Sequence, residues 1–325
     1  MKKQAWLSLV LVLAFLAVTA CGNKNSGNSN PAAAPESSAP ASSAAAESPS
    51  PSPSPEPSKE PIKVKIGVTG SDGPQWPLFK EKAKAELNID IELIEFSDYT
   101  LPNLALANKE VDINSFQHLA FLSQFNVEHK LDIVPIGSTV VAPLGLYSQK
   151  YKAVTEIPDG SEIAVPDDPS NQGRGLLVLQ QAGLIKLKDN PGLFATPDDI
   201  VENPHKIKIV SVVAQQTPRV LPDVAASIIN GGIAGQAGLK LADAIFHDDP
   251  EAESTRPYIN VFAVRKEDKD NASYLELAKL YQQPDIAEAV LKDTNGASFV
   301  TNIPVDQLQQ TLDQLIENIK ASNAK

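Results

Sequence analysis

The sequence beyond residue 60 predicts an α/β protein of two lobes with a ligand cleft between them. Segments with the two-residue period of a strand alternate with segments of helical period, as in a mostly parallel sheet covered by helices. The strands divide into a group before about Pro143 and a group after it. Three helices follow the last strand and are expected to return to the first group. We therefore place the first lobe at 61–142 plus 258–325 and the second at 143–257.

Each lobe is assigned its elements from apolar periodicity and from proline and glycine punctuation. Strands of the first lobe are predicted at 62–68, 89–96, 111–114, within the extended stretch 131–147 that Pro135 and Pro143 interrupt, and at 258–266. Its first helices are predicted at 74–87, 101–109 and 117–128. The second lobe has predicted strands at 162–166, 207–213 and 225–230 and a helix at 170–182. The final helix places one apolar face at Leu308, Leu312, Leu315, Ile316 and Ile319.

The amino terminus has the pattern of an export signal. Lys2 and Lys3 precede an apolar run, AWLSLVLVLAFLAVTA, that is shorter than the ~20 residues of a membrane-spanning helix. The run ends in Val-Thr-Ala before Cys21, the single cysteine of the chain, and this boundary resembles the bacterial lipobox. We expect a signal peptide at 1–20, lipidation of Cys21 with fatty acyl chains such as palmitate, and a place on the outer face of the cell membrane. An ordinary signal peptide with a chance cysteine is the alternative.

Residues 21–60 have the composition of a tether. After Cys21 they lack Val, Ile, Leu, Met and aromatic residues, and they end in SPSPSPSPEPSKE. A segment with no apolar side chains to bury is expected to be disordered, and a Pro-Ser repeat favours an extended spacer. A wall-spanning interaction tail is compatible with the same composition.

The charge of the chain argues against one class of partner. Cleavage before Cys21 removes Lys2 and Lys3 and no acidic residue, which takes the formal charge from −12 to −14. Nucleic-acid binding requires basic patches, so we expect no nucleic-acid partner. The four histidines do not have the spacing of metal ligands, and we expect no metal and no cofactor.

The residues that follow the predicted strands suit a small amino-acid-like ligand, because ligands of open α/β sheets bind beyond the carboxyl ends of strands. Arg174, near the start of the helix that Asp168-Pro169 opens, offers a planar fork for a carboxylate, aided by the helix dipole. Asn171 and Asn230 can accept from an ammonium group or donate to a carboxylate. A surface ion pair for Arg174 and a plain turn for Asn230 are the structural alternatives.

Aromatic residues follow two strands of the first lobe. Tyr99, Phe116 and Phe121 would wall a side-chain pocket, in which a thioether gains roughly 0.3–1.5 kcal/mol per aromatic contact. A purely structural place in the core is the alternative for these three residues and for His118. Trp76 follows the first strand, and we expect it near the cleft. Paired catalytic carboxylates, a nucleophile with a base, and a phosphate-binding glycine loop are missing from these strand ends, so we do not expect an enzyme.

Four fragments carry a family resemblance: EFSDYTLPNLAL, INSFQHLAFL, VPDDPSNQGRGLLVLQ and VENPHKIKIV. Together, behind a lipobox, they resemble the methionine-binding lipoprotein family of ABC importers (MetQ/NlpA type) from about residue 63 to 281. The resemblance implies a type II periplasmic-binding-protein fold that closes on an L- or D-methionine-like ligand, and a place for His118 in the pocket. It also implies docking on a permease with an ATPase subunit, by a protein that we expect to be monomeric.

Two departures from the family pattern bear on the ligand. Phe121 stands where tyrosine is common, and Asn230 is followed by Gly231 and Gly232 rather than by bulkier residues. A looser pocket could accept a methionine-containing dipeptide or another apolar amino acid. A surface lipoprotein with a chaperone or adhesive role and no transport function is the alternative from another class.

Overall fold

The computed structural model describes residues 60–294 and 297–323. The expected signal peptide, Cys21 and the tether up to residue 59 lie outside the described residues. Within the described ranges, none of the helices has both the length and the apolar character needed to span a bilayer.

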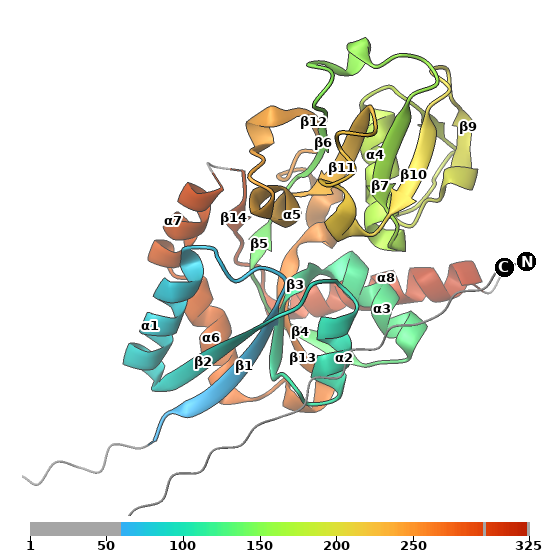
Figure 1. Cartoon of the computed structure of the whole chain (residues 1–325). Helices are drawn as coiled ribbons and strands as arrows, with labels where there is room; N and C mark the ends of the chain where they lie inside the picture. Colours follow the sequence, from blue (N-terminus) through green and yellow to red (C-terminus); the bar gives the residue numbers. More distant parts are fainter. Residues whose placement is uncertain (1–59, 295–296, 324–325) are drawn as a thin grey trace, which may run out of the picture. The chain divides into compact units, whose positions relative to one another are not determined.

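A five-stranded sheet in the order β2-β1-β3-β13-β4 forms the first lobe (Figure 1). Strand β1 (Ile62–Val68) pairs in parallel with β2 (Ile89–Glu95) and β3 (Ile113–His118). Strand β13 (Asn260–Arg265) runs antiparallel to both β3 and β4 (Ile133–Ser138). The sheet therefore combines the predicted β-α units with one strand, β13, that follows the second lobe in the sequence.

Helices cover both faces of this sheet, as the alternation along β13 demonstrates. Phe262 and Val264 pack into a core that holds α1 (Gln75–Leu87), α6 (Ala272–Tyr281) and α7 (Pro284–Asp293). Val261 and Ala263 pack into a second core, which holds α2 (Leu101–Ala107), α3 (Leu119–His129) and α8 (Val305–Asn323). Because neighbouring residues of a strand point to opposite faces, these two cores lie on opposite sides of the sheet.

A second five-stranded sheet, in the order β10-β7-β11-β6-β12, forms the second lobe. Strand β7 (Glu162–Pro166) pairs in parallel with β10 (Lys208–Val212) and β11 (Ala226–Asn230). Strand β6 (Leu144–Tyr147) is antiparallel to β11 and to β12 (Ala244–His247). Its helices are α4 (Pro169–Gln181) and α5 (Gly231–Gln236). The α/β architecture of two lobes agrees with the fold class predicted from the sequence.

The chain passes between the lobes twice. It leaves the first sheet after β4, forms β5 (Val140–Val141), and enters the second sheet as β6. It returns after β12 through the 3₁₀ helix Glu253–Tyr258 and continues as β13. Strand β5 pairs with β14 (Phe299–Val300), which comes from the carboxyl-terminal part of the chain.

Several short elements were not predicted from the sequence, because they are too short to show a period. They are β12, β14, α5, the strand pair β8 (Lys186–Leu187) with β9 (Ile200–Glu202), and 3₁₀ helices at Val154–Glu156, Pro197–Asp199, Ala214–Gln216, Leu241–Asp243, Glu253–Tyr258 and Lys266–Asp268. Helix α5 also begins with two glycines, which are poor helix formers. It is fixed by packing, since Ile233 and Ala234 are buried.

The predicted boundary between the third strand and the helix that follows it was wrong. The strand expected at 111–114 spans Ile113–His118, and the helix expected from Gln117 begins at Leu119. Pairing with β13 keeps this segment extended as far as His118, which lies opposite Asn260. Pro135 does not interrupt its strand, because β4 is an edge strand and pairs only with β13, where a missing N–H is tolerated.

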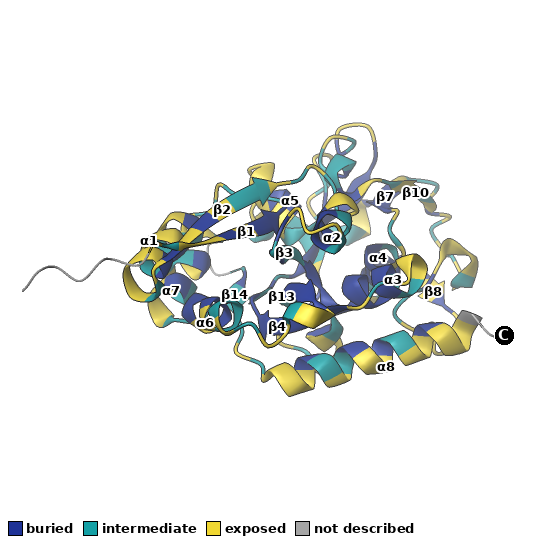
Figure 2. Cartoon of the chain, turned by 90° about the horizontal axis from the view of Figure 1, so that it is seen from below, coloured by how far each residue is buried: buried dark blue, intermediate teal, exposed yellow. Residues whose placement is uncertain are grey.

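Helix α8 has the amphipathic character predicted from its sequence (Figure 2). Leu308, Leu312, Leu315 and Ile319 are buried along one face, and Ile316 is partly buried beside them.

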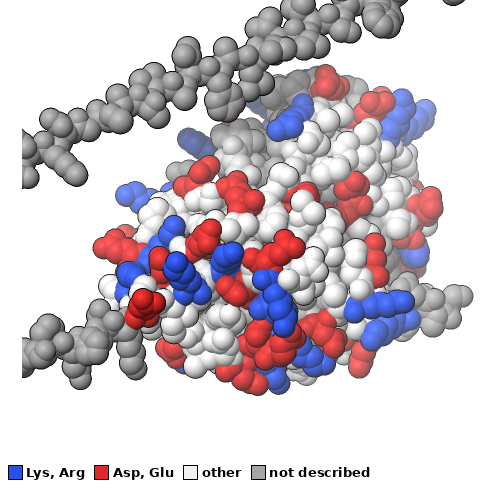
Figure 3. All heavy atoms as spheres, turned by 60° about the horizontal axis from the view of Figure 1, so that its bottom comes forward, with Lys and Arg blue, Asp and Glu red and all other residues white. Residues whose placement is uncertain are grey.

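On the molecular face seen in Figure 3, basic side chains are interspersed with acidic ones. Exposed ion pairs contribute little to stability, because water and salt screen them.

Candidate functional site

A pocket of about 450 Å³ lies between the lobes and is lined from both of them. Ligand pockets commonly have volumes in this range. The structure places all seven predicted site residues in its lining: Tyr99, Phe116, His118, Phe121, Asn171, Arg174 and Asn230. Trp76 also lines the pocket, and its Nε1 donates to the carbonyl of Gly70 at 3.1 Å. That these residues bind a ligand stays a prediction.

Three aromatic rings form a cluster on the first-lobe side of the pocket. The ring centroids of Tyr99, Phe116 and Phe121 lie 5.8–6.0 Å from one another. Phe121 also stacks on Phe125, which anchors it to the next turn of α3. The cluster is therefore both packed into the protein and open to the pocket, and it offers an apolar wall for a side chain.

His118 joins the start of α3 to the second lobe. Its Nδ1 accepts a hydrogen bond from the Phe121 backbone N–H at 3.0 Å and so caps the helix. The proton of the neutral ring is then on Nε2, which lies 3.2 Å from Asn171 Oδ1 and donates to it. Burial, together with the nearby positive charge of Arg174, lowers the pKa of His118 to about 3. The ring is therefore neutral at physiological pH.

A chain of amide and carboxylate groups continues from His118 into the second lobe. Asp168 caps α4 by accepting from the Asn171 backbone N–H at 3.0 Å, and both of its carboxylate oxygens accept from Asn171 Nδ2. Asn171 Oδ1 accepts from His118 and from Asn230 Nδ2, the latter at 2.7 Å. The Asn171 carbonyl oxygen thus accepts two hydrogen bonds from protein groups, and its amide nitrogen is turned to the Asp168 carboxylate, which suits a positioning role.

Asn230 differs from Asn171 in one respect. Its Oδ1 atom is buried and has no hydrogen-bond partner among the described residues. A buried acceptor without a partner costs about 1–3 kcal/mol. Asn230 lines the pocket, and an ammonium group there would supply the missing donor once the side chain turns this oxygen toward it, so Asn230 is the stronger candidate of the two asparagines for direct ligand contact.

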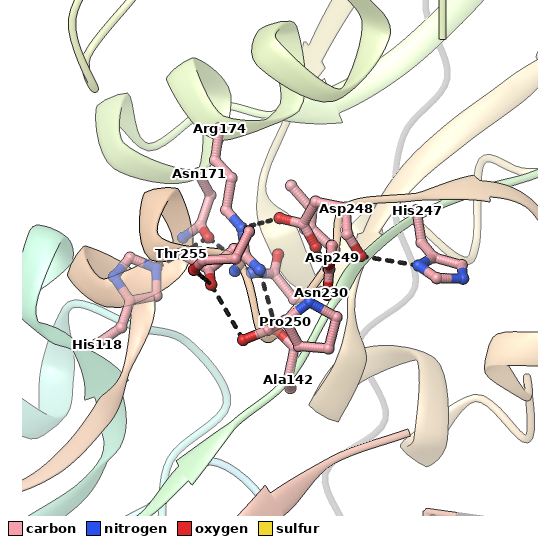
Figure 4. Close-up of polar contacts among 12 residues, drawn as sticks. His118, Ala142, Asn171, Arg174, Asn230, His247, Asp248, Asp249, Pro250 and Thr255 are labelled. Atoms are coloured by element: carbon pink, nitrogen blue, oxygen red, sulfur yellow. Dashed lines mark hydrogen bonds and ion pairs between the residues drawn. The ribbon is translucent and has the colours of Figure 1, made fainter. Parts of the chain in front are cut away.

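Arg174 is held on three sides by protein groups, and Figure 4 draws its contacts with Asp248 and Ala142. Its Nε donates to Asp248 Oδ2 at 2.7 Å, and its Nη2 donates to the Ala142 carbonyl at 2.9 Å. The guanidinium carbon lies 4.4 Å from the centre of the Tyr258 ring. Nη1 has no hydrogen-bond partner within residues 60–294 and 297–323. That nitrogen is available for the carboxylate that the sequence led us to expect.

Sequence reasoning missed the partners of Arg174. We weighed a surface ion pair, whereas the ion pair with Asp248 is buried, with side-chain exposures of 5% and 7%. Asp248 follows an unpredicted strand, and Tyr258, predicted as the first residue of the strand at 258–266, is the last residue of a 3₁₀ helix. Neither position has a motif that would have identified it as a partner of Arg174.

The lobes are also joined at the rim of the pocket. Gln236 Nε2, on α5 of the second lobe, donates to the Thr69 carbonyl of the first lobe at 2.7 Å. Gly70 leaves room for this contact, because a Cβ there would lie 2.4 Å from Gln236 Nε2. Together with the bond from His118 to Asn171, this contact links the lobes directly.

Taken together, the described groups of the pocket match the three parts of an amino acid. Arg174 offers donors for a carboxylate, Asn230 offers an acceptor for an ammonium group, and the aromatic cluster offers a wall for an apolar side chain. No group of three or more potential metal-ligating side chains occurs within the described part of the chain.

The buried histidine predicts a pH effect on stability. In the unfolded chain His118 is protonated below its ordinary pKa of 6.5. In the folded protein the same ring stays neutral down to a pH of about 3. Folding stability should therefore fall as pH drops through this window, by up to about 1.4 kcal/mol per pH unit. His118→Asn keeps a helix-capping side chain but cannot titrate, so its stability should fall less steeply between pH 6 and 4 in chemical denaturation. Equal slopes in the two proteins would contradict a buried neutral His118.

Comparisons with known proteins identify relatives of this chain. A model of the NlpA lipoprotein family matches residues 64–301. The D-methionine-binding lipoprotein MetQ of Escherichia coli (strain K12) is 41% identical over 239 residues, which are 72% of this chain and 87% of the relative. Protein PG110 of Staphylococcus aureus is 42% identical with a TM-score of 0.75, over 78% of this chain and 99% of that structure. A nutrient-binding protein from Burkholderia cenocepacia, solved with methionine bound, is 39% identical with a TM-score of 0.69, over 73% and 99%.

Proposed function

Because this chain belongs to the NlpA lipoprotein family, we propose that it is the substrate-binding lipoprotein of an ABC importer and that it binds methionine between its lobes. The observation that carries the proposal is the convergence of a cation, an unpaired acceptor and an aromatic wall on one pocket: Arg174, Asn230 and the cluster of Tyr99, Phe116 and Phe121. In this role the protein is a monomer that binds its ligand and does not catalyse a reaction.

The ligand would act by favouring one arrangement of the lobes. A carboxylate on Arg174 and an ammonium on Asn230 bind groups of the second lobe, whereas the aromatic wall belongs to the first lobe. A ligand that touches both lobes binds most strongly when they are close together, so it shifts the population toward the closed form. The permease and its ATPase subunit would then receive methionine from that closed form.

The anchor would keep this exchange at the membrane. Cys21 follows an export signal, and the relatives named above include a lipoprotein from Escherichia coli. We propose that acyl chains on Cys21 fix the protein to the extracytoplasmic face and that residues 22–60 span the distance to the domain.

One experiment tests both halves of the proposal. Full-length protein should be recovered from the membrane fraction, Cys21→Ser protein should not, and both should bind methionine in calorimetry with micromolar or tighter affinity, about −8 kcal/mol or better. Trp76 is the only tryptophan that remains after cleavage before Cys21, so its emission should change on binding. A Trp76→Phe variant controls for that signal.

The ligand arms of this experiment decide between substrates. L-methionine, D-methionine and methionine-containing dipeptides are titrated in parallel into protein freed of any copurifying ligand. Tighter binding of a dipeptide would replace methionine as the substrate within the same role. The methionine proposal fails if none of the three ligands gives heat or a thermal shift.

A further inference from the structure

Asp248 lies behind Arg174 and outside the lining of the pocket. One carboxylate oxygen accepts from Arg174 Nε at 2.7 Å, and the other accepts from the Leu144 backbone N–H at 2.8 Å. The Asp248 backbone N–H also donates to the Leu144 carbonyl at 3.2 Å. With only 6% of its surface exposed, Asp248 is held rigidly against the segment that enters the second lobe.

This contact fixes which edge of Arg174 a ligand can meet. Asp248 occupies the Nε edge, the Ala142 carbonyl takes Nη2, and Tyr258 covers one face of the guanidinium. Without Asp248, the Nε edge would be free and the guanidinium could rotate. With Asp248 in place, Nη1 is the guanidinium nitrogen that has no partner among the described residues and is left for a ligand.

Asp248 also changes the charge that a ligand experiences. The positive charge of Arg174 is balanced by Asp248, and His118 is neutral. Asp168, which is partly buried and bonded to Asn171, adds a second carboxylate, and the structure offers no second cation among the described lining residues. The polar end of the pocket is thus not net positive, although its central side chain is an arginine. When a ligand with only a carboxylate binds here, no net positive charge of the protein offsets the cost of removing its negative charge from water. A zwitterion carries its own positive charge and binds with that cost partly offset.

We propose that Asp248 is a positioning residue that sets the charge preference of the pocket, so that zwitterionic amino acids bind and plain carboxylates of the same shape are rejected. This inference rests on the proposed amino-acid-binding function. Asp248 would thus select ligands by their charge without touching them.

A series of three ligands tests the proposal. Methionine is compared with its desamino analogue, a thioether carboxylate, and its descarboxy analogue, a thioether amine. Neither analogue adds bulk. We expect wild-type protein to bind the desamino analogue at least about tenfold more weakly than methionine and more weakly than the descarboxy analogue. Asp248→Asn, which keeps the shape and removes the charge, should narrow the gap between methionine and the desamino analogue by about tenfold.

Asp248→Glu is the matched control, because it keeps the charge while altering the geometry. It should retain the wild-type order of the three ligands even if it weakens all of them. A merely structural role for Asp248 would weaken the three ligands by one common factor in Asp248→Asn, and that result would overturn the proposal. If Asp248→Asn does not fold, tighter binding of the desamino than of the descarboxy analogue by wild-type protein would overturn it instead.

The two proposals fail in different ways. Failure of wild-type protein to bind methionine at all would remove the proposed function and this inference together. Binding of methionine with an unchanged ligand order in Asp248→Asn would remove only the role of Asp248.

Discussion

Replacing Arg174 with alanine is expected to weaken methionine binding by roughly 30-fold to several thousand-fold. The estimate follows from the 2–5 kcal/mol that is typically lost when one partner of a buried, hydrogen-bonded charge pair is truncated. The variant should also be less stable without ligand, by about 3–5 kcal/mol, because Asp248 would remain buried without its counter-ion. Calorimetry measures the first effect, and chemical denaturation measures the second.

Two controls separate these effects. Arg174→Ala combined with Asp248→Asn should regain part of the stability, because no buried charge is left unpaired, but should not regain binding. Arg265→Ala is the matched control, because Arg265 is the other buried arginine of the described chain and pairs with Asp268 outside the pocket. It should lose stability and keep its affinity. Affinity within about threefold of wild type in Arg174→Ala would remove this residue from the binding site.

Replacing Asn230 with leucine is expected to weaken methionine binding without lowering stability, whereas Arg174→Ala lowers both. Methionine affinity should fall by roughly tenfold to a hundredfold, as expected for a lost hydrogen bond to a charged group, worth about 1.5–3 kcal/mol. Stability without ligand should be unchanged or slightly higher, because a buried acceptor without a described partner is removed. Asn230 makes no side-chain cap to α5, and Asn171 Oδ1 keeps its bond from His118.

Asn126→Leu provides the matched comparison. Asn126 is buried outside the pocket, and its amide both donates to and accepts from the backbone of Ile133, at 2.8 and 3.2 Å. This variant should lose about 1–3 kcal/mol of stability and retain its affinity. If Asn230→Leu instead loses stability and binds methionine normally, Asn230 is a structural residue.

The longer elements could be predicted from sequence because their patterns are local. In β1, Val64, Ile66 and Val68 alternate with polar residues or glycine, and all three are buried. In α8, the spacing of Leu308 and Leu312 marks the buried face. Elements without such a period, including α5 and β12, were missed because tertiary packing, rather than local preference, holds them in place.

For the candidate site, too, one part could be predicted from sequence and another could not. Its seven residues could be chosen because they follow strands or open helices, where open α/β sheets expose side chains, and because the chain resembles a known family. The assignment of roles among them could not be made from sequence. Asn171 and Asn230 are the same residue type near the carboxyl ends of comparable strands, yet only the structure shows that the carbonyl oxygen of Asn171 accepts two hydrogen bonds whereas that of Asn230 has no described partner.

The sequence by itself determined the alternation of strands and helices and the presence of a guanidinium, amides and aromatic rings near strand ends, and it predicts the two lobes and an export signal before Cys21. Periodicity and short motifs carry that information within a few neighbouring residues. Only the tertiary structure decided that Arg174 is paired with Asp248, 74 residues away, and covered by Tyr258. Charge balance and hydrogen-bond saturation depend on which groups meet across the fold, and no local pattern records those meetings.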